Sequence, residues 1–186
     1  FILFISPSIV MIGLGTVALI PIRTYYLDPI DFGVYAMIIG VIAPISAVST
    51  LGGGWVMNAY FFSVSEKEKR SMLFTLSVLD IFVSFVVTSS AALMGPWLMT
   101  RLIEGYSPEW IPFFYLTVLG GFLGVKYGVV FQHMILRRDA KSCATLEIVS
   151  FLSGAIVSTR ALVLGWGLWA LFLGLLVTGA TKGLLC

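Results

Sequence analysis

Six long apolar stretches constrain what this chain can fold into more than any other feature. A helix that crosses a lipid bilayer needs about 20 mostly apolar residues. Six stretches of the 186-residue sequence meet that need, at residues 2–22, 33–62, 72–99, 111–136, 143–162 and 167–186. Only 11% of the residues are charged, against about 25% in a soluble domain. The sequence therefore predicts an all-α, polytopic membrane bundle of about six transmembrane helices.

The second stretch, residues 33–62, is longer than one membrane crossing requires. At about 1.5 Å rise per residue it extends roughly 45 Å, against ~30 Å for the hydrocarbon core. Three consecutive glycines occupy positions 52–54, and glycine adopts backbone conformations that end a helix. We expect this stretch to tilt, to leave the membrane or to break at these glycines.

Lysine and arginine residues in the connections predict the orientation, because cytoplasmic loops carry an excess of them. Seven basic residues fall on one side, namely Lys67, Lys69, Arg70, Arg137, Arg138, Lys141 and Lys182. Three fall on the other side, namely Arg23, Arg101 and Arg160. The sequence therefore predicts a multi-pass protein with the N-terminus and the C-terminus of this six-helix segment in the cytoplasm.

Several functional classes find no support in the residues. The net charge of +2 is too small to predict a nucleic-acid partner. The sequence has one histidine and lacks the H-E-x-x-H, G-x-S-x-G and C-x-x-C patterns, so it nominates neither a catalytic residue nor a metal site. It therefore predicts neither an enzyme nor a bound cofactor. A coupling ion, H⁺ or Na⁺, is the one small ligand that it suggests besides the transported substrate.

A glycine ridge is predicted on the fourth stretch. Gly120, Gly124 and Gly128 recur every four residues, so they share one face of a helix on which a neighbouring helix can approach closely. At about 100° per residue, Lys126 and His133 fall on the opposite face. A charge deep in the membrane costs about 2.5–3.5 kcal/mol, so we expect Lys126 to face a cavity rather than lipid.

Asp80 is the candidate partner of Lys126. Both residues lie about ten positions from the cytoplasmic ends of their helices, near the bilayer midplane. Asp80 also belongs to a polar stripe with Ser77, Ser84 and Thr88, which share one helix face. Two interpretations stay open: the stripe lines a hydrophilic cavity in which Asp80 binds a proton or Na⁺, or Asp80 and Lys126 form a buried ion pair.

Arg23 and Arg160 lie at the outer ends of their helices. Each can extend its guanidinium to the membrane interface. This placement alone would explain both arginines without a role in binding. The alternative is that both border a cationic cavity for an anionic, lipid-linked substrate.

Four short motifs, in this order, resemble one known family. They are Tyr-Leu-Asp-Pro-Ile-Asp-Phe-Gly-Val-Tyr-Ala at 26–36, Ser-Thr-Leu-Gly-Gly-Gly at 49–54, Leu-Arg-Arg-Asp-Ala-Lys at 136–141, and Gly-Trp-Gly-Leu-Trp-Ala-Leu at 165–171. Together they resemble the polysaccharide biosynthesis (O-antigen) flippases of the multidrug/oligosaccharidyl-lipid/polysaccharide (MOP) exporter superfamily. The resemblance covers essentially the whole chain.

The resemblance implies a two-lobed, MATE-like transporter of twelve to fourteen helices in the bacterial inner membrane, of which residues 1–186 match the N-terminal six-helix lobe. We therefore expect the chain to be a fragment whose partners are the missing C-terminal lobe, membrane lipid and a polyprenyl-diphosphate-linked glycan. The family supplies no catalytic residues. The cavity residues Arg23, Asp80, Lys126 and Arg160 are nominated on the physical grounds above.

The sequence thus favours a flippase that moves lipid-linked oligosaccharide or polysaccharide precursors, such as those of lipopolysaccharide, by alternating access. One alternative is a multidrug/cation antiporter of the same superfamily, for which we expect a more acidic cavity. The other is a non-transporting membrane assembly subunit, for which we expect Asp80 and Lys126 to neutralise each other in a dry interface.

Overall fold

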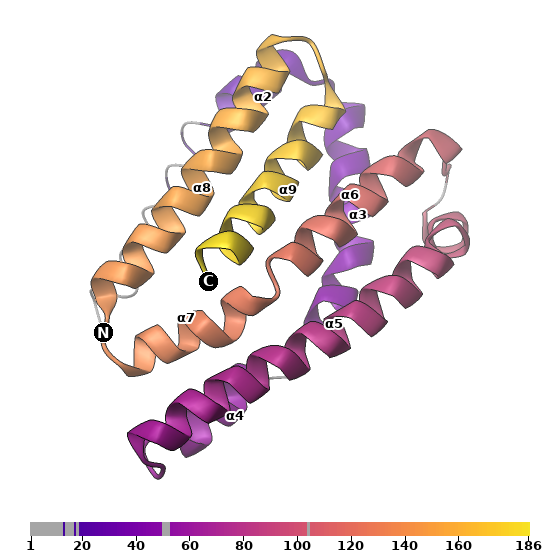
Figure 1. Cartoon of the computed structure of the whole chain (residues 1–186). Helices are drawn as coiled ribbons and strands as arrows, with labels where there is room; N and C mark the ends of the chain where they lie inside the picture. The colour runs from indigo at the N-terminus through magenta and orange to yellow at the C-terminus, as the bar shows by residue number, and fades with distance from the viewer. Residues whose placement is uncertain (1–12, 14–16, 18, 50–52, 104) are drawn as a thin grey trace.

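The protein is an all-α helical bundle (Figure 1). The computed structural model describes Gly13, Val17 and residues 19–49, 53–103 and 105–186. Within these ranges the helices are α2 (Ile20–Tyr26), α3 (Pro29–Ser49), α4 (Gly53–Tyr60), α5 (Glu66–Leu102), the 3-10 helix η2 (Pro108–Trp110), α6 (Ile111–Leu123), α7 (Lys126–Leu136), α8 (Ala140–Val163) and α9 (Leu168–Leu185).

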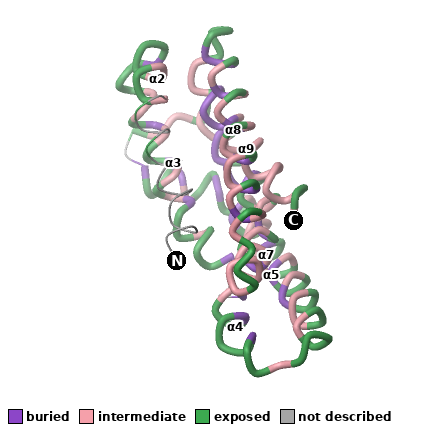
Figure 2. The backbone as a smooth tube through the Cα atoms, turned by 90° about the vertical axis from the view of Figure 1, so that its left-hand side faces the viewer, coloured by how far each residue is buried: buried purple, intermediate pink, exposed green. Residues whose placement is uncertain are grey.

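In the part of the chain that the structure describes, five helical segments are long and apolar enough to cross a membrane, which supports the predicted polytopic fold. They are Pro29–Tyr60, Glu66–Leu102, Pro108–Leu136, Ala140–Val163 and Leu168–Leu185. The expected first span, residues 2–22, lies largely outside the described residues. Large apolar side chains cover the outside of α5, where Phe82 is 65% exposed and Leu93 86% exposed, and Figure 2 shows exposed positions along much of this helix. A surface of this kind is stable in lipid rather than in water.

α5 begins at a capping box in the predicted cytoplasmic connection. The backbone N–H of Glu68 donates to the Ser65 hydroxyl, and the Glu68 carboxylate accepts from the Ser65 N–H at 2.7 Å. These bonds satisfy N–H groups that a helix start leaves free. The helix then runs for 37 residues with Pro96 inside it. It is about 55 Å long, so it extends past both ends of the predicted stretch 72–99.

Two of the predicted stretches contain more than one helix. α3 ends at Ser49 and α4 begins at Gly53; the predicted break at 52–54 falls partly on residues 50–52, which lie outside the described residues. The fourth stretch, predicted as one helix, is divided between α6 and α7 at Gly124 and Val125. There the Val125 N–H donates to the Phe122 carbonyl, three residues back, at 3.2 Å. This tighter turn interrupts the α-helical ladder.

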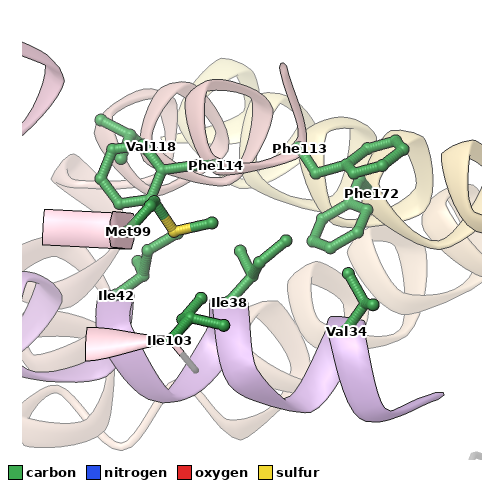
Figure 3. Close-up of a cluster of buried hydrophobic side chains, with 9 residues drawn as sticks. All are labelled: Val34, Ile38, Ile42, Met99, Ile103, Phe113, Phe114, Val118 and Phe172. Atoms are coloured by element: carbon green, nitrogen blue, oxygen red, sulfur yellow. The ribbon is translucent and has the colours of Figure 1, made fainter. Parts of the chain in front are cut away.

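A cluster of buried apolar side chains joins α3, α5, α6 and α9 (Figure 3). α3 contributes Val34, Ile38 and Ile42, which recur every four residues and so share one face. On the facing helices, the rings of Phe113 and Phe172 stack at a centroid distance of 4.9 Å. The remaining members are Met99, Ile103, Phe114 and Val118.

α9 packs between α6 and α8 through residues without large side chains. A Cβ built on Gly179 would collide with the Gly120 carbonyl oxygen, and one built on Gly120 would lie 3.1 Å from the Leu176 Cα. On the α8 side, a Cβ on Gly154 would lie 2.6 Å from the Gly174 carbonyl oxygen. Small residues permit this backbone approach, which gives membrane helices their packing contacts.

The predicted glycine ridge therefore extends only part of the way. Gly120 and Gly124 face α9, and a Cβ on Gly124 would lie 3.5 Å from the Gly179 Cα. At Gly128 a Cβ would meet no other described atom within 4 Å. The expectation for Gly128 is wrong because this residue belongs to α7, beyond the turn at Gly124 and Val125, so the 100° spacing does not carry across.

The two basic connections lie at the same end of the bundle. Glu66 at the start of α5 forms an ion pair with Arg137, which follows α7, at 2.9 Å. Glu66 also pairs with Lys69 at 2.8 Å. Because these pairs are exposed, they contribute little stability, but they bring together the segments that carry most of the predicted cytoplasmic charge.

Replacement of Gly179 with alanine should destabilise the bundle. The new methyl group would collide with the Gly120 carbonyl, and overpacking of this kind costs about 1–3 kcal/mol. Gly128→Ala is the matched control, since its methyl group has room and alanine favours the helix by about 0.5–1 kcal/mol. Unfolding by denaturing detergent should separate the two variants; equal stabilities would contradict the packing described for α9.

Acid should release the N-terminus of α8. Two hydrogen bonds from Ser142 lower the pKa of Asp139. The one from its side chain has the larger effect, and the one from its backbone N–H the smaller. The stabilisation is complete above the unfolded-state pKa of about 3.9 and is lost as the pH falls through the lower folded-state value. The protection of the Ser142 amide against hydrogen exchange, measured relative to its intrinsic exchange rate at each pH, should therefore fall in acid, and in Asp139→Ala already at neutral pH. The Leu164 amide, at the far end of α8, is the internal control.

Candidate functional site

A hollow lies between α3, α5, α6, α7 and α9. It consists of two adjoining cavities of about 180 and 370 Å³. The cavities share the lining residues Ile42, Ser46, Thr117, Gly121, Gly124 and Tyr127. Glycines supply much of the α6 wall, so backbone rather than side chain borders the space there. The same glycines that admit α9 thus leave room beside it.

Hydroxyl groups line this hollow. They belong to Ser46, Ser49, Thr88, Thr117, Tyr127 and Thr178. Several donate their proton to a carbonyl of their own helix, such as Thr117 to Phe113 at 2.8 Å and Thr178 to Gly174 at 2.9 Å. Each such oxygen keeps lone pairs that can accept a further hydrogen bond. The hollow therefore offers hydrogen-bond acceptors, and the hydroxyl protons of Ser49, Thr88, Thr117, Tyr127 and Thr178 are already bonded within the protein.

A chain of polar contacts links three helices at one wall of the hollow. Lys182, in the last turn of α9, places its Nζ 4.2 Å from the centre of the Tyr127 ring. The Tyr127 hydroxyl on α7 donates to a Glu147 carboxylate oxygen on α8. A cation over an aromatic face is favourable. The hydrogen bond from Tyr127 gives the partly buried Glu147 carboxylate a donor. Lys182 is the only charged residue among the described lining of the hollow.

Asp80 lies outside this lining. It is 2% exposed on α5, where it faces Gly53 of α4 and Val129 of α7. Its Oδ1 has no hydrogen-bond partner among the residues that the structure describes, and the same holds for the Ser84 hydroxyl one turn later. Of the predicted polar stripe, Thr88 reaches the hollow, whereas Asp80 and Ser84 are enclosed in a helix interface.

Lys126 is not the partner of Asp80. The ion pairs among the described residues join Glu66 to Lys69 and to Arg137. Lys126 is exposed at the start of α7 and borders a separate groove of about 350 Å³, together with Ile81, Phe122, Leu123, Val125, Ala180, Gly183 and Leu184. The buried ion pair, one of the two interpretations left open, is therefore not formed among the described residues, because the turn between α6 and α7 places Lys126 at this groove beside α9.

Arg23 and Arg160 lie at another end of the fold. α2, which carries Arg23, packs on α8, which carries Arg160 in its last turn. Leu27, just after α2, joins a buried cluster with Ala161 and Leu162. Neither arginine borders the hollow. The four nominated residues thus occupy three separate places, and the structure does not gather them into one cavity.

The residues that do meet at the hollow were not nominated from the sequence. Lys182 entered only the charge count, and Tyr127 and Glu147 are 20 residues apart on different helices. No local spacing connects residues of three helices. The one available signal was a lysine and a glutamate inside apolar stretches, where ionisable residues usually serve a function.

Comparison with known proteins adds no further assignment. No family model matches this chain, and no curated protein or solved structure matches it either.

Tyr127→Phe should destabilise the contact between α7 and α8. The change removes the donor to Glu147, and a buried acceptor left unpaired costs about 1–3 kcal/mol. Tyr60→Phe is the control, since Tyr60 is 57% exposed. Chemical or detergent unfolding measures both. Equal stabilities of the two variants would mean that the Tyr127 hydrogen bond contributes nothing.

Proposed function

We propose that this protein is a membrane transporter, and that it forms the N-terminal lobe of a flippase for lipid-linked oligosaccharide or polysaccharide precursors. The proposed substrate is a glycan attached to a polyprenyl diphosphate. It would move across the bacterial inner membrane by alternating access between this lobe and a second, C-terminal one. The basic connections would face the cytoplasm.

The hollow is the observation that carries this proposal. Its hydroxyl oxygens suit the hydroxyl groups of a sugar, and the Lys182 ammonium suits a phosphate. A space with hydroxyl groups and one lysine in a mostly apolar wall, bordered by helices that can span a membrane, is also compatible with alternating access, because a polar substrate must be shielded from lipid.

The same lining weighs against the two alternatives. A multidrug/cation antiporter calls for an acidic cavity, whereas the carboxylate nearest to Lys182 in the contact chain, Glu147, is occupied by Tyr127. An assembly subunit calls for an Asp80–Lys126 pair in a dry interface, and Lys126 is instead exposed. The flippase accounts for both observations.

Transport should depend on Lys182. In vesicles that contain the full-length protein and a labelled polyprenyl-diphosphate oligosaccharide, we expect Lys182→Gln to slow lipid translocation about tenfold to a hundredfold. That range corresponds to loss of one charged hydrogen bond of about 1.5–3 kcal/mol. The unsubstituted full-length protein must first be shown to move the labelled lipid across the bilayer. If it does not, the flippase proposal is wrong.

Lys126→Gln is the matched control for this experiment. Both lysines lie near the C-terminal half of α9, but only Lys182 borders the hollow. Normal transport by Lys126→Gln with slow transport by Lys182→Gln would support the hollow as the substrate path. The reverse result would assign that path to the groove beside Lys126.

A further inference from the structure

Two polar side chains are buried on one face of α5. Asp80 is 2% exposed and Ser84 1% exposed, and they are four residues apart, so they lie on successive turns. Neither the Asp80 Oδ1 nor the Ser84 Oγ has a hydrogen-bond partner among the described residues. Native proteins rarely leave buried polar atoms unpaired, and such atoms call for an explanation.

Gly53, the first residue of α4, closes over the Asp80 carboxyl group. A Cβ at Gly53 would lie 2.7 Å from Oδ2, 2.8 Å from Oδ1 and 2.9 Å from a methyl carbon of Val129. The carboxyl is thus enclosed by a glycine of α4 on one side and an apolar side chain of α7 on the other. A methyl group at position 53 would require the Asp80 side chain, the Val129 side chain or α4 itself to shift.

Among the residues that the structure describes, no cation forms an ion pair with the Asp80 carboxyl group. α4 offers Tyr60, which is 57% exposed, and α7 offers Lys126, Tyr127 and His133. The Tyr127 hydroxyl is engaged with Glu147, Lys126 borders the groove beside α9, and the His133 ring packs on Phe61 at 5.8 Å.

The charged and titratable groups on α5 itself and on the other helices that pack on it do not pair with the Asp80 carboxyl group among the described residues. On α5 itself, Arg70 is ten residues away, about 15 Å along the helix, and Arg101 is farther. α3 and α6 also pack on α5; α3 carries Asp31 and Tyr35, and α6 carries Tyr115. The Tyr35 ring packs on Phe172 of α9 at a centroid distance of 5.4 Å. Asp31 lies in the first turn of α3, and Tyr115 is 40% exposed. Among the described residues no ion pair reaches Asp80.

We propose that Asp80 is a proton-binding site whose occupancy controls the contact between α4 and α5. Removing a carboxylate from water without a partner costs several kcal/mol, so the enclosed arrangement accommodates the protonated acid. When Asp80 releases its proton, the carboxylate needs water, and α4 moves away from Val129 to admit it. Between the proton and Na⁺ the packing favours the proton, because Na⁺ would need several further oxygen ligands around the carboxylate. The inference is independent of any transported substrate.

Thiol labelling of Val129→Cys tests this proposal, since Val129 is fully buried beneath Gly53. The experiment uses the full chain in lipid nanodiscs, with Cys143 and Cys186 replaced by alanine and a water-soluble maleimide as the probe. Lys141→Cys, at an exposed position, is labelled in parallel to correct for the pH dependence of thiol reactivity. The corrected rate at position 129 should rise about tenfold between about pH 5 and about pH 8, the equivalent of 1.4 kcal/mol.

Three further variants identify the group responsible. Asp80→Asn, which mimics the neutral acid, should keep the rate low at both pH values, and His133→Gln should keep the rise. Gly53→Ala should raise the rate at both, because its methyl group displaces α4. A flat profile in the parent, a rise that survives in Asp80→Asn, or a rise lost in His133→Gln would each overturn the proposal. If Gly53→Ala does not fold, the Asp80→Asn comparison still decides.

Discussion

The close approach of α9 to α6 and α8 is the contact on which the rest of the bundle depends. Gly179 meets the Gly120 carbonyl on one side, and Gly154 and Gly174 bring α8 close on the other. Helices in lipid gain no hydrophobic free energy from meeting each other, so tight packing and hydrogen bonds must hold them together. The hydrogen bond between Ser153 and Thr181 at 2.9 Å adds to the α8–α9 interface. Side chains larger than these would force the helices apart.

The hollow is a consequence of that packing. α6 presents glycines both to α9 and to the space beside it, so the backbone approach that fixes α9 also leaves the hydroxyl-lined cavities open. α9 then brings Lys182 to Tyr127. In another part of the bundle polar side chains are buried: Asp80 lies beside Gly53 of α4, and neither its Oδ1 nor the Ser84 Oγ has a hydrogen-bond partner among the described residues. One side of α5 therefore borders polar space at Thr88, while the other encloses a carboxyl group.

Much of the fold could be predicted from the sequence, and rather little of the site. The expected stretches 143–162 and 167–186 correspond closely to α8 and α9, because apolar length alone defines a spanning helix. The stretch 111–136 was predicted as one helix, and the turn at Gly124 and Val125 divides it. That turn also accounts for the expectation that fails at Gly128, which was positioned by counting 100° per residue through it.

By itself the sequence determined that the chain forms apolar helices. Backbone N–H and C=O groups in lipid must bond within their own segment, so about 20 apolar residues leave no other choice. Only the tertiary structure decided which polar residues meet. Lys182, Tyr127 and Glu147 come from three helices, and their contacts depend on how those helices are rotated and spaced. Asp80 and Lys126 were expected at similar depths in the membrane, but depth does not specify which way a side chain points around its helix. Packing places Asp80 beside Gly53 and Lys126 at the groove beside α9.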